Sequence, residues 1–209
     1  MTAIRNGDGW SYTLTPTDKL WAGRMAQYEG GEAADVLWTM TQAYAKDAIH
    51  NAYPTFTRFI QAYSQPINPI WRRDGSKCRP GGAYHDRDEC SAVRLERRDR
   101  AATIPWAELD ANIREITDRW YAGTLPNPVP RAVEFAAPYV SEGFLARNPG
   151  SEVVRRLDNW YIATASSLRW PANWVTMDGS VAGIALVGGL VYVGYRYWRG
   201  RRYAPKRRR

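Results

Sequence analysis

The sequence predicts a mainly α-helical globular domain followed by one C-terminal transmembrane helix. Apolar residues recur at three- and four-residue steps in several segments, which is the spacing of one helix face. Signals for strands are scarce, and an uncharged apolar run over 181–195 precedes a strongly basic end. The expected layout is an N-terminal arm over 1–14, a domain over 15–175, a transmembrane helix over 176–198 and a basic tail over 199–209.

The positive charge is concentrated at the C-terminal end of the chain. The formal net charge is +8, and residues 196–209 hold eight of the 29 Lys and Arg residues and no acid, so 21 basic residues face 21 acidic ones elsewhere. The body is therefore neutral, unlike a typical nucleic-acid-binding domain. A chain of 209 residues with 44% hydrophobic content is not disordered and suffices for one domain with a core. Its thirteen tyrosines and ten tryptophans suit a sugar-binding groove or a membrane interface.

Two consecutive helices are expected after the arm. Thr15 suits the N-cap position, and Pro16 and Asp18 suit the first turn, so the first helix begins there. Its apolar stripe ends at the glycine pair 30–31, and a second helix begins at about Glu32. The residues expected to face inward are Leu20, Trp21, Met25 and Tyr28 in the first helix and Val36, Leu37, Met40, Ala43 and Tyr44 in the second.

Three later segments complete the helical prediction. A short helix within 53–71 gives way to the loop "SQPINP", because Pro66 and Pro69 exclude a regular helix or a central strand. Residues 104–123 have the pattern of an amphipathic helix, and residues 150–166 are expected to form a last helix. The inward residues of the first two segments are Phe56, Phe59, Ile60, Tyr63, Trp106, Leu109, Ile113, Ile116 and Trp120.

Two cysteines close a short loop rich in glycine and charge. Cys78 and Cys90 suit a disulfide in an oxidising compartment, with free thiols or a metal site through His85 as alternatives. A structural zinc site needs four ligands, and this loop offers three, so a disulfide is predicted and no metal is assigned.

The apolar run is short for a membrane span, but flanking aromatic residues extend it. The alternative is a buried core helix. If the segment spans a membrane, the basic tail stays on the cytoplasmic side and residues 1 to about 175 lie across it. The sequence begins without the apolar region of a signal peptide, so delivery by a virus particle or insertion through the C-terminal span is expected.

Glu29 stands at the end of the first predicted helix, directly before two glycines. The unpaired carbonyl groups of a helix C-terminus carry partial negative charge, so a carboxylate there is disfavoured and tends to keep its proton. Either this side chain is solvated, or it is a proton donor. Glu32 opens the next helix, where a negative charge is favoured, and is the expected charged neighbour.

Other common catalytic arrangements are missing from the sequence. Neither His50 nor His85 has the partner motif of a nucleophilic triad, and no P-loop, GxGxxG or HExxH motif occurs. Acid–base catalysis by a carboxyl group remains, with Glu29 as the best-placed acid and no cofactor. A glycosidase with two carboxyl groups needs a second acid, for which Asp35, Asp74 and Glu134 are candidates; a single catalytic acid is the preferred interpretation.

Two segments carry a resemblance to a known family. "LWAGRMAQYEGGEAADVLWTMTQAYA" and "WYAGTLPNPVPRAVEFAAP" resemble the opening and closing patterns of the spore-cortex-lytic type of cell wall hydrolases and related phage muralytic proteins. The resemblance implies a lysozyme-like fold, of the α+β lysozyme superfamily, that cleaves the peptidoglycan strand between N-acetylmuramic acid and N-acetylglucosamine. The chain departs from the family at Glu134, where a histidine is frequent, and in the loop of the two cysteines.

The resemblance also implies roles for individual residues. Glu29 matches the family acid that protonates the glycosidic oxygen and then acts as a base in lytic transglycosylation. Tyr63, Ser64 and Gln65 match the positions of substrate-binding groups in such enzymes. Ser64, Gln65 and Asn68 are also neutral hydrogen-bonding residues of a kind that binds sugar hydroxyls and acetamides, and with Tyr28 and Glu32 they complete the expected substrate-binding residues. The alternative for the loop "SQPINP" is a turn whose polar residues have no role in binding.

Two functions of different classes follow from the sequence. The first is a phage-associated, membrane-anchored enzyme, in the virion or the bacterial inner membrane, that opens peptidoglycan during genome entry or lysis. The second is a non-catalytic structural protein of a virion or membrane complex, in contact with other virion proteins. In both, the tail contacts packaged DNA or anionic lipid. Its contact residues are Arg199, Arg201, Arg202, Lys206, Arg207, Arg208 and Arg209.

Overall fold

The computed structural model describes residues 2–179 and has a mixed α and β architecture. Helices make up about 48% and strands 13%, and the strands form two sheets of three strands each. The prediction of a mainly α, lysozyme-like domain is therefore wrong. The strands are three to five residues long, which is too short for an alternating pattern to stand out in the sequence.

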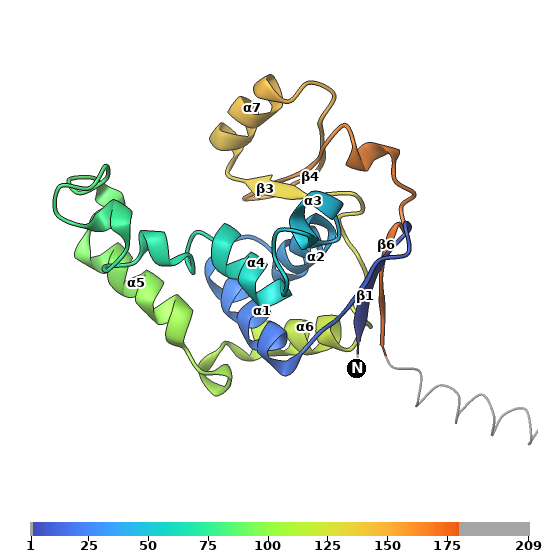
Figure 1. Cartoon of the computed structure of the whole chain (residues 1–209), viewed down its shortest axis with the longest axis horizontal. Coiled ribbons are helices and arrows are strands. Elements are labelled where there is room, and N and C mark those ends of the chain that lie inside the picture. Colours follow the sequence, from blue (N-terminus) through green and yellow to red (C-terminus); the bar gives the residue numbers. More distant parts are fainter. Residues whose placement is uncertain (1, 180–209) are drawn as a thin grey trace, which may run out of the picture.

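A group of helices forms the centre of the molecule (Figure 1). These helices are α1 (Pro16–Tyr28), α2 (Ala33–Tyr44), α3 (Asp47–His50), α4 (Phe56–Tyr63) and α6 (Ala111–Tyr121). Their apolar faces meet in one core, in which Tyr44, Phe56 and Trp120 are almost completely buried. The predicted starts of α1 and α2 and the inward face of α2 are confirmed, whereas in α1 only Met25 of the four predicted inward residues is buried. Helix α6 is shorter than predicted, since the 3-10 turn η4 (Trp106–Glu108) precedes it.

The start of α1 is fixed by a buried carboxylate. Thr15 is the N-cap, its hydroxyl accepts from the Asp18 N–H, and Asp18 accepts in return from the Thr15 N–H at 2.9 Å. Asp18 also accepts from the Thr57 N–H and hydroxyl at 2.8 and 2.7 Å and from the Tyr12 hydroxyl at 2.9 Å. With 1% of its surface exposed, Asp18 joins the first sheet, α1 and α4.

The first sheet brings the two ends of the described chain together. It has the order β2-β1-β6, with β1 (Ala3–Asn6) between β2 (Ser11–Thr13) and β6 (Val175–Asp178), all antiparallel. Ile4 lies opposite Met177 and packs into the core. Residues 1–14 were expected to form an arm without regular structure, and this expectation is wrong, because β1 and β2 pair with each other and β1 also pairs with β6, far away in the sequence.

The predicted membrane helix is corrected at its beginning. Residues 176–178 belong to β6, so they are strand and not helix. No helix within residues 2–179 is long and apolar enough to cross a membrane. The remainder of the predicted span and the basic tail lie outside the described residues.

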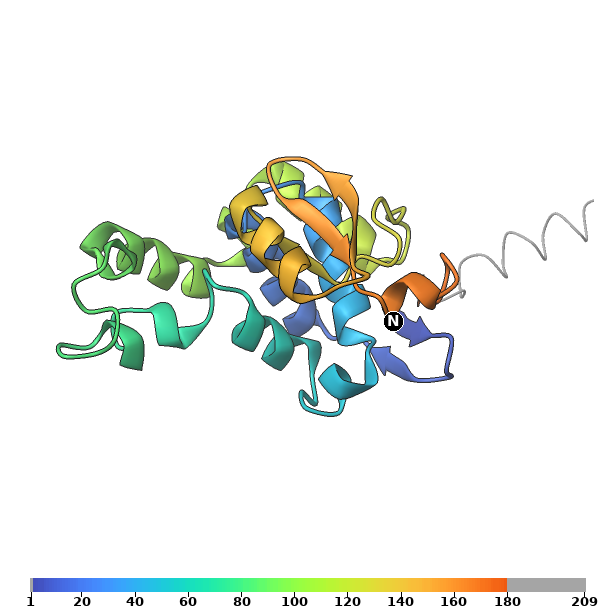
Figure 2. The ribbon, with the colours of Figure 1, turned by 90° about the horizontal axis from the view of Figure 1, so that it is seen from above.

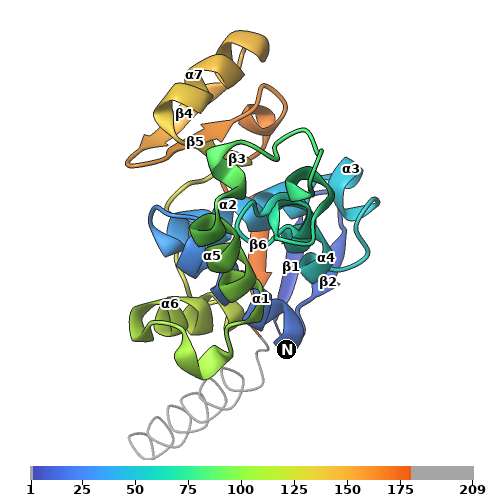
Figure 3. The same cartoon turned by 90° about the vertical axis from the view of Figure 1, so that its left-hand side faces the viewer.

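The second sheet forms a separate layer with α7 (Pro138–Arg147), on one side of the central helices (Figure 3). Its order is β3-β5-β4, with β5 (Trp160–Ala163) between β3 (Glu134–Ala136) and β4 (Glu152–Arg156). The predicted helix over 150–166 is wrong, because this segment is a β4–β5 hairpin. Its Val, Ile, Trp and Tyr residues favour strands, and the Leu157 N–H donates to the Asn159 carbonyl at 3.0 Å in the turn.

A disulfide-closed arm projects from the helical centre (Figure 2). It consists of the 3-10 turns η1 (Pro69–Trp71), η2 (Ser76–Cys78) and η3 (Asp88–Cys90), followed by α5 (Ala92–Thr103). The predicted disulfide between Cys78 and Cys90 is confirmed. Inside the arm, Trp71 and Tyr84 pack with ring centroids 5.2 Å apart. A last 3-10 turn, η5 (Ser167–Arg169), precedes β6.

Candidate active site

Glu29 is held at a rigid junction between α1 and α2. It is the C-cap of α1, and its N–H donates to the Met25 carbonyl at 2.9 Å. Gly30 and Gly31 follow with φ of 77° and 84°, a left-handed conformation that glycine adopts without strain. A Cβ on Gly31 would lie 2.6 Å from the Tyr161 hydroxyl, so the second sheet packs directly against this turn.

The carboxyl group of Glu29 is tuned to exchange a proton near neutral pH. Burial raises its pKa from 4.5 to about 7. The Ser64 hydroxyl and the Gln65 backbone N–H favour the charged form and limit this rise. The Ser64 Oγ is itself buried and has no hydrogen bond of normal geometry among residues 2–179, so it is free to respond to a change of charge at Glu29. The sequence-based expectation that this acid keeps its proton agrees with the direction of the pKa shift.

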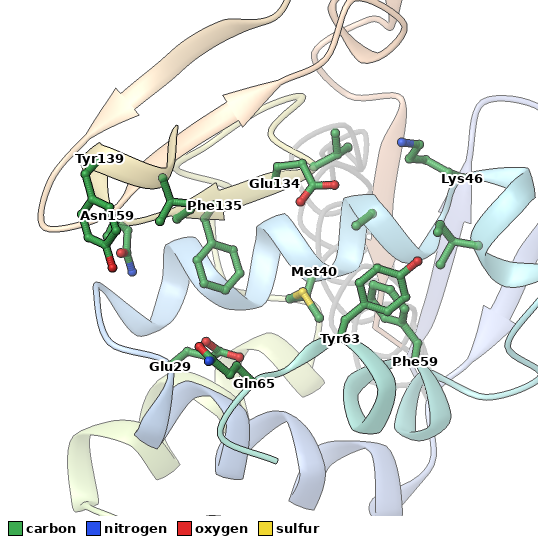
Figure 4. Close-up of a pocket in the computed structure, with 16 residues that line it drawn as sticks. Glu29, Met40, Lys46, Phe59, Tyr63, Gln65, Glu134, Phe135, Tyr139 and Asn159 are labelled. Atoms are coloured by element: carbon green, nitrogen blue, oxygen red, sulfur yellow. The ribbon is translucent and has the colours of Figure 1, made fainter. Parts of the chain in front are cut away.

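A cavity of about 410 Å³ opens beside Glu29 (Figure 4). It lies between the central helices and the second sheet, with Glu29 and Gln65 at one end. Two tyrosines are largely exposed at its surface, Tyr63 at 50% and Tyr139 at 79%. Exposed aromatic rings beside a concave surface provide flat apolar faces on which sugar rings pack. The remaining lining residues are Met40, Ala43, Lys46, Ile49, Phe59, Val133, Glu134, Phe135, Ala136, Ala137, Val140 and Asn159.

A second carboxyl group faces the same cavity. Of the three candidates for a second acid, Glu134 lines it, from β3. The pKa of Glu134 is raised by burial and lowered in part by Lys46. The residue as a whole remains exposed at the cavity. Asp35 is buried in an ion pair with Arg155, at 2.8 Å, and Asp74 is an exposed residue of the arm.

Three of the predicted substrate-binding residues line a cavity next to Glu29. Tyr63 and Gln65 line the first cavity, and Tyr28 and Gln65 line a second one on the other side of the acid. Ser64 is buried and lines neither cavity. Its hydroxyl favours the charged form of Glu29, so it stabilises the acid instead of contacting a ligand.

The other predicted binding residues lie away from both cavities. Glu32 is exposed at the N-cap of α2. The Asn68 side chain donates to the Ala62 carbonyl at 2.7 Å and accepts from the Ile70 N–H at 2.9 Å, so it stabilises the loop. The predicted contact residues of the tail, from Arg199 to Arg209, lie outside the described residues.

No protein-family model, curated protein or solved structure matches this chain. The resemblance to cell wall hydrolases therefore depends on the two quoted segments alone. Any functional argument has to come from the geometry and chemistry of the two cavities.

Several lining residues carried no signal in the sequence. Lys46, Tyr139 and Asn159 lie in segments with no motif, and they reach the cavity through the packing of α2 and the second sheet. The Asn159 Nδ2 donates to the Gly30 carbonyl at 3.1 Å, which ties the β4–β5 turn to the turn after Glu29. An asparagine in a predicted helix interior was the one available hint, because asparagine is unfavourable there and common in turns.

Proposed function

We propose that this protein cleaves the glycan strand of peptidoglycan, with Glu29 as the general acid. The observation that carries the proposal is a partly buried carboxyl group, whose pKa is raised to about 7, at the end of a cavity with exposed tyrosines. Glycoside cleavage needs an acid that is still protonated at the working pH, since the leaving sugar oxygen departs as a hydroxyl. About half of the Glu29 side chains carry that proton at pH 7.

The surroundings of Glu29 suit both halves of such a reaction. In the first step Glu29 transfers its proton to the glycosidic oxygen, the bond to the anomeric carbon breaks, and the carboxylate remains. The Ser64 hydroxyl and the Gln65 N–H then stabilise this anion. In the second step the carboxylate accepts a proton from the nucleophile that attacks the anomeric carbon, which restores the acid. The nucleophile is the 6-hydroxyl of muramic acid in a transglycosylase, or water in a hydrolase.

The lining of the cavity suits a sugar chain. Tyr63 and Tyr139 offer flat faces for sugar rings, and the side-chain amides of Gln65 and Asn159 are suited to hydroxyl and acetamide groups. Neutral amides fit the uncharged N-acetyl sugars better than a row of fixed charges. The setting in a phage particle stays a prediction from the sequence.

The position of Glu134 supports hydrolysis as a second candidate reaction. A glycosidase with two carboxyl groups places the second one across the scissile bond, as a nucleophile or as a base for water. Glu134 lines the same cavity as Glu29 and comes from a different element. If Glu29 works alone, Glu134 serves to bind substrate.

The products of the reaction test both candidates. The purified full chain is incubated with peptidoglycan sacculi, and the released fragments are separated and weighed. Anhydro ends indicate transglycosylation and reducing ends indicate hydrolysis. Glu29→Gln should abolish release, whereas Glu134→Gln should abolish it only in a hydrolase that uses both acids. Glu115→Gln, an exposed position on α6 away from both cavities, is the matched control. An inactive wild-type chain would contradict the proposal.

A further inference from the structure

A second cavity of about 320 Å³ continues the site beyond Glu29. Glu29 and Gln65 line both cavities, so the acid stands between them. The first cavity is bounded by aromatic residues and the second sheet. The second is bounded by α5 of the arm and by the loop after α4, and it is lined by Tyr28, Gly30, Pro66, Arg94, Arg97 and Arg98 besides the two shared residues.

The second cavity is strongly basic. Arg94, Arg97 and Arg98 are spaced so that they lie on one face of α5, where like charges repel and destabilise a helix. The only carboxyl group among the lining residues described is that of Glu29, which is largely protonated below pH 7. An arginine cluster beside a proton-holding acid indicates a site for an anion.

The three arginines differ in how they are held. Arg98 is buried and donates to the carbonyls of Trp71 and Glu89, so it holds α5 against the 3-10 turns of the arm. Its pKa is lowered, first by burial and then by repulsion from Arg94. Arg94 forms an exposed ion pair with Asp88 at 2.6 Å. Arg97 is exposed and has no ion pair or side-chain hydrogen bond within residues 2–179, so its guanidinium is available to a ligand.

We propose that this arginine cavity binds a carboxylate of the peptide that branches from the glycan strand next to the cleaved bond. This inference depends on the proposed function, because it takes the ligand in the first cavity to be a peptidoglycan strand. In such a strand the peptide is attached to the muramic acid, one of the two sugars that the cleaved bond joins. A strand bound across Glu29 therefore places the peptide beside the acid. Arginine binds carboxylates through paired N–H donors, which suits a peptide carboxylate and not a neutral sugar.

The consequence is selectivity for glycan strands that carry peptides. Binding of the carboxylate also compensates the repulsion between arginines on α5. The aromatic cavity then recognises the sugars, and the arginine cavity recognises the negative charge of the peptide beside them.

A binding experiment tests the inference separately from catalysis. The full chain with Glu29→Gln, which cannot cleave, is titrated with soluble glycan strands that carry their peptides and with the same strands after their peptide carboxylates have been converted to amides with carbodiimide and ammonia. Adding Arg97→Gln should weaken binding of the peptide-bearing strands with free carboxylates by about tenfold or more and that of the amidated strands by less than about twofold. Arg73→Gln, an exposed arginine of the same arm outside the cavity, is the matched control and should change neither.

Several outcomes would overturn the inference. Equal weakening for both kinds of strand, no effect of Arg97→Gln, or no detectable binding of peptide-bearing strands would each exclude a peptide site. The proposed function is judged independently, by release of fragments from sacculi by the wild-type chain. A chain that cleaves both kinds of strand equally well, with and without Arg97→Gln, keeps the proposed function and loses this inference.

Discussion

Replacing Glu29 by glutamine should stabilise the protein, and only above a certain pH. Glutamine imitates the protonated acid in shape and charge. In the folded protein the pKa of Glu29 is about 7, against 4.5 for the ordinary side chain. This difference corresponds to a penalty of about 3 kcal/mol for holding the charged carboxylate in the folded state.

The pH range of the effect follows from the two pKa values. Below pH 4.5 the carboxyl group is protonated in both the folded and the unfolded chain, so the wild type bears no penalty. As the pH rises from 4.5 to 7 the unfolded chain releases the proton and the folded one keeps it, so wild-type stability falls. Above about pH 7 both are ionised and the penalty stays constant. The advantage of Glu29→Gln should therefore grow from about zero at pH 4 to about 3 kcal/mol at pH 8.

Chemical denaturation of both full chains from pH 4 to pH 9 measures this difference directly. Glu115→Gln, which removes an exposed carboxylate on α6, shows what the loss of a surface charge does by itself. A stability difference that does not change with pH would mean that the Glu29 carboxyl group is solvated. The pKa of Glu29 would then be that of an ordinary side chain, and Glu29 would not hold a proton to donate at neutral pH. In the wild type, glycan cleavage should fall about tenfold for each pH unit above 7, because the protonated fraction falls by that factor.

Three further predictions concern the elements that hold the site. Asp18→Ala should lower the free energy of unfolding by about 3 kcal/mol or more, measured by denaturation, because it removes a buried cap with several charge-assisted hydrogen bonds. Gly31→Ala should destabilise the protein more than Gly30→Ala, although both glycines have positive φ. A Cβ at Gly31 would collide with the Tyr161 hydroxyl of the second sheet, whereas a Cβ at Gly30 meets no atom. Equal effects of the two substitutions in thermal denaturation would contradict that packing. Opening the Cys78–Cys90 disulfide by replacing both cysteines with serine should cost about 3 kcal/mol and make the arm sensitive to limited proteolysis.

The first two helices were predictable because their signals are local, whereas α3, α5 and α7 were not predicted. The Thr15 cap, the proline after it and the glycine pair after Glu29 act within a few residues of the helix ends, and the structure uses each of them as predicted. The disulfide was also predictable from a short spacing between two cysteines. These features need no information about distant parts of the chain.

The strands were not predictable in the same way. Strand β1 pairs with β6, so the register of residues 3–6 depends on residues 175–178. Each strand is too short to show alternation, and the β4–β5 segment contains charged residues spaced as on a helix. The pairing energy that decides the structure comes from contacts that a local pattern does not contain.

The residues of the candidate site show the same difference between local signals and long-range packing. Glu29 was found because an acid at a helix C-terminus is a local anomaly. Glu134 was one of three equal candidates, and the packing of β3 against α2 distinguishes it from the other two. Arg97 had no role in the sequence argument, because its importance comes from the arm turning α5 toward the end of α1.

The position of Glu29 explains why the surrounding structure is so constrained. A carboxylate at a helix C-terminus that is partly shielded from water opposes stability, and the chain could avoid that cost with any neutral residue. Instead, two positive-φ glycines, a buried serine and the β4–β5 turn all hold this side chain at the boundary of two cavities. A purely structural domain has no use for a residue that weakens it above pH 4.5. An enzyme that must deliver a proton to a glycosidic oxygen at neutral pH needs such a residue. The functional proposal therefore depends most on the measured pH dependence of the stability of Glu29→Gln.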